Sequence, residues 1–237
     1  MLVSVTITEK VIKSKIKSGD KTIVVENIKY PYFESETHQK LCKKMNEFYS
    51  SVAEKYSNHV KNKLAGKIKR ITSHAKLPAI VRMNYTAVLC CEKIISVVLD
   101  LSFLQGEKIK ERRFSQMWSI KRGDVLPLSE ILETNNKSRK TILSYMQKKA
   151  EENGRNSAFG YFSDYSSRLT KNFSISNGFV APNGVCFFIN AGVLSPVKYG
   201  ACNFVIPFDE IKSIAKGDFL SKCAEKECQT SDIVNNI

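Results

Sequence analysis

The residues that most often carry out chemistry are few and widely spaced in this chain. Its three histidines, His38, His59 and His74, lie in the first third, and no two are four residues apart, as paired metal ligands on a helix would be. The seven cysteines contain no pair separated by two residues, the spacing common in zinc sites. We therefore predict no metal ligands and no cofactor.

Motifs for nucleophilic catalysis and phosphate binding are also missing from the sequence. It contains no Gly-x-Ser-x-Gly elbow and neither of the glycine-rich phosphate loops. Asp100 falls, by strand register, on the face opposite Leu99 and Leu101, so we interpret it as a solvated or paired residue rather than a general base. We expect no catalytic residues and no enzymatic activity.

The cysteines fit a reducing compartment. Their number is odd, and the adjacent Cys90 and Cys91 cannot easily bridge to each other. With Cys186 and Cys202 they lie in apolar stretches, where a free thiol behaves as a small core residue.

The first ten residues alternate apolar with polar, unlike a secretory signal, and no stretch approaches about 18 apolar residues. We expect a cytoplasmic protein without a membrane span, unless a leader has been removed.

Positive charge dominates the 237 residues, with 37 Lys and Arg against 23 Asp and Glu and a formal net charge of +14. The cations concentrate at Lys10–Lys21, Lys61–Arg70 and Lys108–Arg113. Such a field attracts acidic proteins, nucleic acids and other polyanions without selecting among them. The alternative is a solvated surface that keeps the protein soluble.

The first third predicts a hairpin followed by a long helix. Residues 3–15 and 21–28 read as strands around the turn Lys17-Ser18-Gly19-Asp20, and Pro31 should interrupt the second strand. From about 35 to 64, apolar residues recur every three or four positions, which indicates one buried helical face. Part of the charge at Lys61–Arg70 then simply follows the end of this helix.

The remainder predicts a meander of three strands, a second helix at about 137–152, and three short strands. We expect Asn135 or Asn136 to cap the helix and the strands to cover 172–176, 185–189 and 203–206. Grouped strands favour an α+β fold with antiparallel sheets, one long and one shorter helix, and two closely packed α+β units. We divide the chain into a hairpin and helix unit (1–78), a second α+β unit (79–217) and a polar tail (218–237).

Several stretches resemble the RsiV C-terminal domain family: Phe173–Ile175, Asn183–Ile189 and Pro196–Phe208, with Gly123–Leu132 and Ile28–Phe33 upstream. The resemblance implies a Gram-positive, often spore-forming bacterium and a binding module without established catalytic residues. Members include the lysozyme-binding ectodomain of an anti-sigma factor and non-catalytic parts of peptidoglycan deacetylases.

Two departures from the family pattern matter. Gln105-Gly106-Glu107-Lys108 stands where the family usually carries a Gly-Gly-Ala-His-like loop, and the chain shows neither leader nor membrane anchor. A strongly basic surface would also repel lysozyme, which is itself cationic, so we do not carry lysozyme sensing over.

We conclude from the sequence that the chain is a non-enzymatic binding or regulatory module. Its partner would be an acidic protein or polyanion, and the resemblance implies a link to the cell envelope or sporulation. The alternatives are an unrecognised cell-wall-associated enzyme or accessory protein, and a nucleic-acid binder driven by charge. Lys198 and Tyr199, beside Pro196, are the candidate partner contacts, against the plainer interpretation of a loop between strands.

Overall fold

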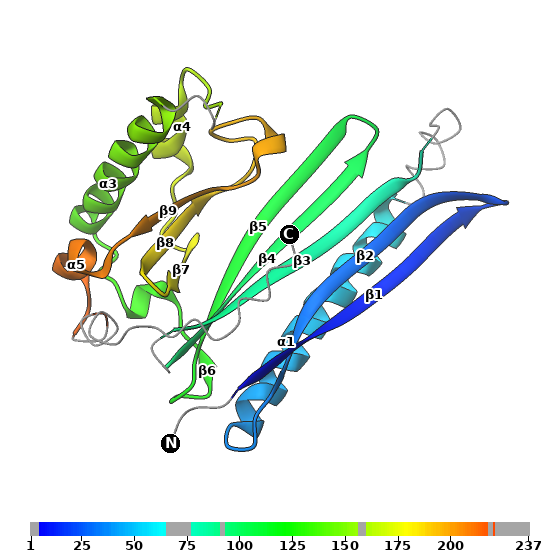
Figure 1. Ribbon diagram of the computed structural model, residues 1–237, viewed down its shortest axis with the longest axis horizontal. Helices are drawn as coiled ribbons and strands as arrows, with labels where there is room; N and C mark the ends of the chain where they lie inside the picture. The colour runs from blue at the N-terminus through cyan, green and yellow to red at the C-terminus, as the bar shows by residue number, and fades with distance from the viewer. Residues whose placement is uncertain (1–4, 65–76, 91–92, 156–159, 218–219, 221–237) are drawn as a thin grey trace. The chain divides into compact units, whose positions relative to one another are not determined.

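The protein is a mixed α+β structure with a six-stranded sheet, ordered β1-β2-β3-β4-β5-β6, and a three-stranded sheet, ordered β7-β8-β9 (Figure 1). The computed structural model describes residues 5–64, 77–90, 93–155, 160–217 and 220. The predicted α+β class is confirmed. The first half of the chain forms β1 (Thr6–Ser18), β2 (Lys21–Glu34), α1 (Gln39–His59), η1 (Val60–Leu64), β3 (Ala79–Cys90), β4 (Ile94–Gln105) and β5 (Lys108–Ser119).

The second half is richer in short elements. It contains β6 (Asp124–Val125), η2 (Leu128–Glu130), α3 (Asn136–Arg155), α4 (Tyr165–Asn172), β7 (Gly178–Ala181), β8 (Gly184–Ile189), η4 (Val197–Tyr199), β9 (Cys202–Ile206), α5 (Phe208–Ile211) and η5 (Lys212–Ile214). Among the described helices, none combines the length and apolar character that crossing a bilayer requires.

The chain divides into two compact units that are both discontinuous in sequence. One comprises residues up to Thr86 together with Leu99–Arg112, and the other comprises Ala87–Val98 together with the residues from Arg113 onward. The division differs from the sequence-based one at residue 78, because β3, β4 and β5 each contribute residues to both units. Most of the tail, 218–237, lies outside the described residues.

The predicted hairpin is formed by β1 and β2, which pair antiparallel from Thr6 opposite Glu34 to Ser18 opposite Lys21. The expectation that Pro31 would interrupt the second strand was wrong. On its other side β2 pairs with β3 only over Val24–Ile28, so Pro31 lies beyond that ladder and its missing N–H costs no hydrogen bond there.

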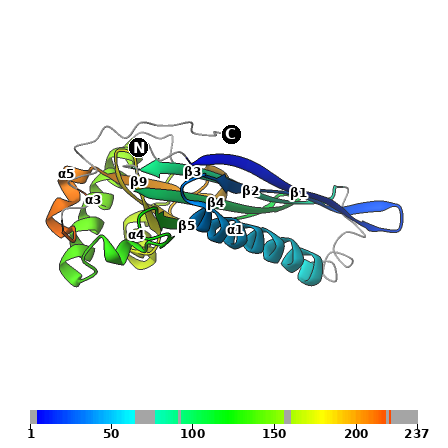
Figure 2. The ribbon, with the colours of Figure 1, turned by 90° about the horizontal axis from the view of Figure 1, so that it is seen from below.

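Helix α1 runs along one face of the sheet (Figure 1, Figure 2) and returns the chain so that β3 pairs parallel to β2. The prediction of purely antiparallel sheets is corrected here, because a strand, a helical crossover and the next strand form a parallel pair. The predicted apolar stripe is confirmed as the buried side of this helix. Of its members, Leu41, Cys42, Met45, Tyr49 and Ala53 are buried, whereas Phe48 is 37% exposed.

A buried carboxylate joins α1 to the sheet. Glu26 on β2 is 1% exposed and accepts hydrogen bonds from the Ser14 hydroxyl on β1 and from Ser57 Oγ on α1, the latter at 3.1 and 3.3 Å. Lys61 Nζ lies 3.6 Å from Glu26 Oε2 and supplies the opposite charge. This ion pair gives the beginning of the basic stretch at Lys61–Arg70 a structural role, while residues 65–70 lie outside the described part.

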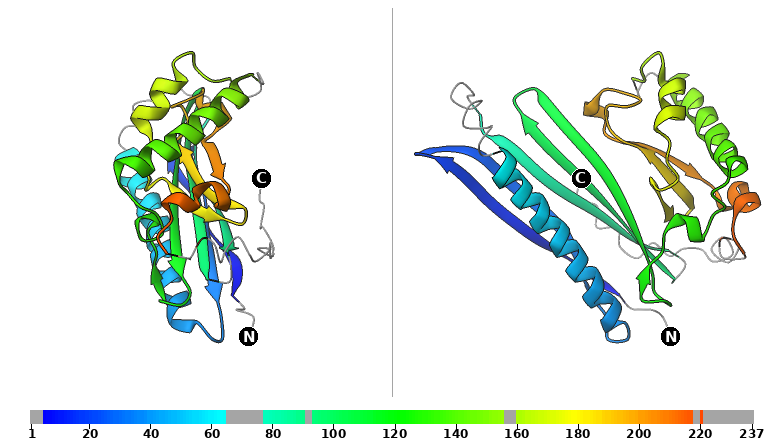
Figure 3. Two further views of the ribbon diagram at one scale, coloured as in Figure 1. Left: turned by 90° about the vertical axis from the view of Figure 1, so that its left-hand side faces the viewer. Right: turned by 180° about the vertical axis from the view of Figure 1, so that it is seen from behind.

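In the second unit, α3 and α4 pack with the three-stranded sheet around one apolar core (Figure 3, left). The strands predicted at 185–189 and 203–206 are confirmed as β8 and β9. The strand predicted at 172–176 was wrong: Asn172 ends α4, a turn closes from Asn177 N to Ser174 O, and β7 starts at Gly178. Helix α4 escaped prediction because Leu169 is its one buried residue, which leaves no helical stripe to detect.

Of the two residues predicted to cap α3, Asn135 and Asn136, the structure shows Asn135 in that role. Its Oδ1 accepts hydrogen bonds from Ser138 N at 3.0 Å and from Ser138 Oγ at 3.1 Å.

Replacing Asn135 with alanine should lower the free energy of unfolding by about 0.5–2 kcal/mol, because amide donors in the first turn lose their acceptor. Urea denaturation would measure this. Asn136→Ala, one residue further on, is the control and should change the stability by less than about 0.5 kcal/mol.

Candidate functional site

The predicted contact residues Lys198 and Tyr199 lie in a tight turn between β8 and β9. The turn is closed by hydrogen bonds from Tyr199 N to Pro196 O at 3.0 Å and from Gly200 N to Val197 O at 2.9 Å. Gly200 has φ of +73°, which glycine adopts without strain as the chain leaves the turn. Both side chains are exposed, Tyr199 by 48%, and Lys198 Nζ lies 5.0 Å from the centre of the Tyr199 ring. A cation and an aromatic face are therefore presented together.

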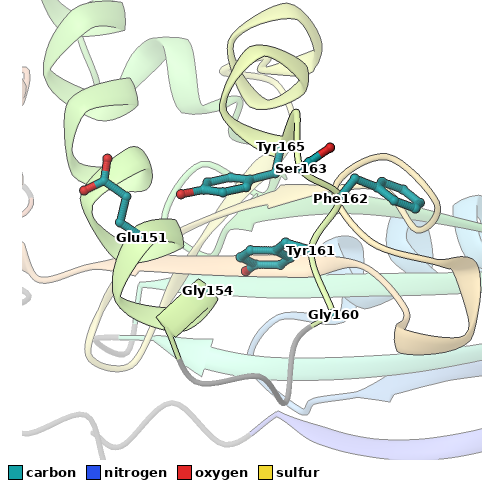
Figure 4. Close-up of a pocket in the computed structure, with 7 residues that line it drawn as sticks. All are labelled: Glu151, Gly154, Gly160, Tyr161, Phe162, Ser163 and Tyr165. Atoms are coloured by element: carbon teal, nitrogen blue, oxygen red, sulfur yellow. The ribbon is translucent and has the colours of Figure 1, made fainter.

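A pocket of about 510 Å³ lies in the same unit, between the end of α3 and the start of α4 (Figure 4). Figure 4 shows the rings of Tyr161 and Tyr165 side by side, with their hydroxyl ends toward the end of α3 that carries Glu151. The two ring centres are 5.4 Å apart. The pocket is lined by Glu151, Gly154, Gly160, Tyr161, Phe162, Ser163 and Tyr165.

The pocket and the turn touch each other. Gly160, with φ of +51°, packs so closely on the Tyr199 ring that an added Cβ would lie 2.9 Å from Tyr199 Cε2. Phe162 N also donates a hydrogen bond of 2.8 Å to Leu194 O, which ties the pocket segment to the loop that precedes the turn. One surface therefore combines the aromatic pocket with the predicted contact residues. We call this set the aromatic site; its members are Glu151, Gly154, Gly160, Tyr161, Phe162, Ser163, Tyr165, Lys198 and Tyr199.

A second cation lies over a ring in this site. Arg168 Cζ is 4.6 Å from the centre of the Phe162 ring, and Arg168 Nε is held by Asp164 Oδ1 at 2.7 Å. The arginine beside it lowers the pKa of the Asp164 carboxyl through this hydrogen bond. Phe162 is thus contacted by a cation that Asp164 orients, and the rings of Tyr161 and Tyr165 contact each other.

A thiol, that of Cys202, contacts the pocket residue Tyr161. Cys202 Sγ lies 3.7 Å from Ser195 Oγ and also hydrogen-bonds Tyr161. Burial raises the pKa of the Cys202 thiol, and these two hydrogen bonds oppose the shift without cancelling it. Burial likewise raises the pKa of the Tyr161 hydroxyl. A thiol with a raised pKa is protonated at neutral pH and is a poor nucleophile.

The other residues considered in the sequence stay apart. His38 precedes α1 and His59 ends it, while His74 lies outside the described residues. Cys42 and Cys186 are buried free thiols, as predicted for Cys186, whereas Cys202, also predicted as a core thiol, is only partly buried. The side chain of Cys90 and residues Cys91, Cys223 and Cys228 are not described. Within the described part of the chain, no group of three or more His, Cys, Asp or Glu is placed to hold a metal ion.

Comparison with known proteins gives a fold and no activity. No family model matches the sequence, and no curated protein matches it. Among solved structures, a DUF3298 family member from Bacteroides fragilis is similar with a TM-score of 0.68 and 13% identity, covering 95% of this chain and 99% of that one. A DUF3298 family protein from Pseudomonas aeruginosa has a TM-score of 0.55 and 11% identity, covering 91% and 95%. Identities this low show a shared fold alone.

These comparisons correct the predicted membership in the RsiV C-terminal domain family. No family model supports it, and the solved structures that match, at 13% and 11% identity, show a shared fold alone. The stretches Asn183–Ile189 and Pro196–Phe208 include β8 and β9, whose apolar residues fill a core that this fold requires. Short apolar strands of this kind are too weakly specific to assign a family. The Gram-positive source that the resemblance implied stays a prediction.

Proposed function

We propose that this chain is a non-enzymatic binding module that recognises an acidic protein through the aromatic site. The observation that carries the proposal is the exposed Lys198–Tyr199 pair packed against a pocket lined by Tyr161, Phe162 and Tyr165. Tyrosine and arginine next to a concave surface are the residues that most often supply binding energy at protein interfaces. The net charge of +14 favours an acidic partner.

A catalytic role for the pocket has less support. General acid–base chemistry usually pairs a proton donor with a proton acceptor, and Glu151 is the one carboxylate among the pocket-lining residues. Cys202, the neighbouring thiol, has a raised pKa. An unrecognised enzyme is therefore the alternative function. The cysteine usage favours a reducing compartment such as the cytoplasm, which stays a prediction.

Replacing the two exposed residues should remove the partner. The full chain and the double variant Lys198→Ala/Tyr199→Ala would each be immobilised, and the proteins captured from a cell extract would be quantified by mass spectrometry. We expect the wild type to capture at least one acidic protein. The affinity of that protein for the double variant should be about tenfold or more lower, because truncating an aromatic anchor commonly costs more than about 1 kcal/mol of binding free energy.

Lys110→Ala/Phe114→Ala is the matched control, because it also removes an exposed lysine and an aromatic ring that is 43% exposed. This control should retain the partner. If the Lys198/Tyr199 variant keeps every partner of the wild type, the aromatic site is not the binding surface. If the chain instead binds nucleic acid, its affinity for an oligonucleotide should fall about tenfold or more over a modest salt increase. The fall should be equal for the wild type and the two double variants.

A further inference from the structure

Strand β1 is an edge of the six-stranded sheet. It pairs with β2 in unbroken register from Thr6 to Ile16, and no described strand lies along its other side (Figure 3, right). At 13 residues it is longer than most strands, and it contains no proline. Its backbone therefore presents a row of N–H and C=O groups on which another strand could be built.

The two faces of β1 differ in character. Ile12 and Ile16 are half-buried in the apolar clusters on the face that α1 covers, so part of each side chain still reaches the edge. On the opposite face Lys13, Lys15 and Lys17 are exposed at alternate positions. Their cross-strand neighbours on β2 are Asn27, Val25 and Thr22, which carry no charge.

These three lysines make no ion pair with another described residue. The acidic residue of β1, Glu9, is instead paired with Lys29, whose Nζ lies 3.2 Å away. The segment Val11–Lys17 is therefore a stretch of uncompensated positive charge along an open backbone edge.

We propose that β1 binds an extended acidic segment of another protein, which adds to the sheet as a further strand. Directly opposed side chains on neighbouring strands lie about 4.5–5.5 Å apart, so acidic residues at every second position would meet Lys13, Lys15 and Lys17. The intervening side chains would then meet Ile12 and Ile16 on the other face. The partner is thus a segment in which acidic and apolar residues alternate.

Edge lysines also protect a sheet from pairing with itself, and this role supports the choice of partner. Two copies of β1 paired antiparallel about Lys15 would oppose lysine to lysine, which disfavours a dimer in that register. An acidic strand reverses the sign of the same interaction. The charges that disfavour this pairing of two copies therefore favour an acidic segment.

This inference concerns a different surface from the aromatic site and does not depend on it. Its test uses two labelled peptides, Glu-Val-Glu-Val-Glu-Val-Glu and the block sequence Glu-Glu-Glu-Glu-Val-Val-Val, with affinity measured by fluorescence anisotropy on the full chain. We expect the alternating peptide to bind about tenfold more tightly than the block peptide. Hydrogen exchange should slow at amides of β1 when the alternating peptide is bound.

Two triple variants remove the same number of charges. The affinity for the alternating peptide should fall about tenfold in the edge variant, Lys13→Gln/Lys15→Gln/Lys17→Gln. It should fall by less than about threefold in the control, Lys40→Gln/Lys55→Gln/Lys108→Gln, whose lysines are exposed elsewhere. Lys198→Ala/Tyr199→Ala should bind the peptide like the wild type, so failure of the aromatic site and failure of this edge are distinguishable.

Several results would overturn the inference. They are equal affinity for the two peptides, equal loss in the two triple variants, protection from exchange outside β1, and no binding at millimolar peptide. Equal affinity for a single-stranded oligonucleotide would point to unselective attraction of polyanions instead. Concentration-dependent dimerisation that the Lys13/Lys15/Lys17 variant alters would point to a second copy of the chain as the occupant.

Discussion

Replacing Phe187 with alanine is expected to lower the free energy of unfolding by about 3–5 kcal/mol, as measured by urea denaturation. Phe187 lies on β8, the middle strand of the three-stranded sheet, and is 0% exposed. Its ring meets Phe173 edge to face with ring centres 5.8 Å apart. Truncation would lose this contact and leave a cavity that backbone hydrogen bonds on both sides of β8 prevent from closing.

Phe114→Ala is the control, since its ring is 43% exposed and its removal should change the stability by no more than about 0.5 kcal/mol. A loss below about 1 kcal/mol for Phe187→Ala would show that this core can collapse around the missing ring. The result also bears on the aromatic site, because β8 and β9 hold the turn of Lys198 and Tyr199 between them.

Elements whose residues are close in sequence could be predicted from it. The hairpin follows from alternating residues around Gly19, which has φ of +59° at the turn. The long helix follows from its apolar stripe, and Met45 and Tyr49 on that stripe are fully buried. The Asn135 cap follows from the preference of a side-chain acceptor for the first turn. Each of these features depends on one local pattern.

Features that depend on contacts between distant residues could not be predicted. The parallel pairing of β2 with β3 is decided by where α1 delivers the chain, and strand composition does not record this. Nothing in the local sequence distinguishes Glu26 from other polar strand residues. Its partners Ser57 and Lys61 lie on and just after α1, a helix that begins thirteen residues later. Local periodicity contains no information on such partners.

The candidate site shows the same division. Lys198 and Tyr199 could be singled out because Pro196 and Gly200 bracket a short segment between two strands. The pocket beside them was missed because the contact of Gly160 with Tyr199 joins positions about forty residues apart. One local signal was present: three aromatic residues, Tyr161, Phe162 and Tyr165, occur within five positions of a stretch without regular periodicity. Aromatic residues that no helix or strand pattern explains are candidates for a binding surface.

The stability of the protein should fall between about pH 10 and pH 12 by about 2 kcal/mol through Tyr56 alone. Burial, and secondarily the nearby Glu26 carboxylate, raises the pKa of Tyr56 to about 12 in the folded protein. In the unfolded chain the ordinary value is near 10. Because the folded state holds the proton more tightly, the contribution is fully present below about pH 10 and is lost as the pH rises through the folded pKa.

Tyr56→Phe isolates this effect from other groups that titrate at high pH. The variant loses the hydrogen bond from the Tyr56 hydroxyl to Ser102 O, 3.1 Å long, and should be about 0.5–1.5 kcal/mol less stable than the wild type at neutral pH. Because phenylalanine cannot ionise, the difference in unfolding free energy should shift by about 2 kcal/mol in favour of the variant by about pH 11.5. Urea denaturation at a series of pH values measures both curves. A difference that stays constant with pH would mean that Tyr56 ionises with the same pKa in the folded and unfolded chain, and that packing of α1 on the sheet does not shield its hydroxyl from water.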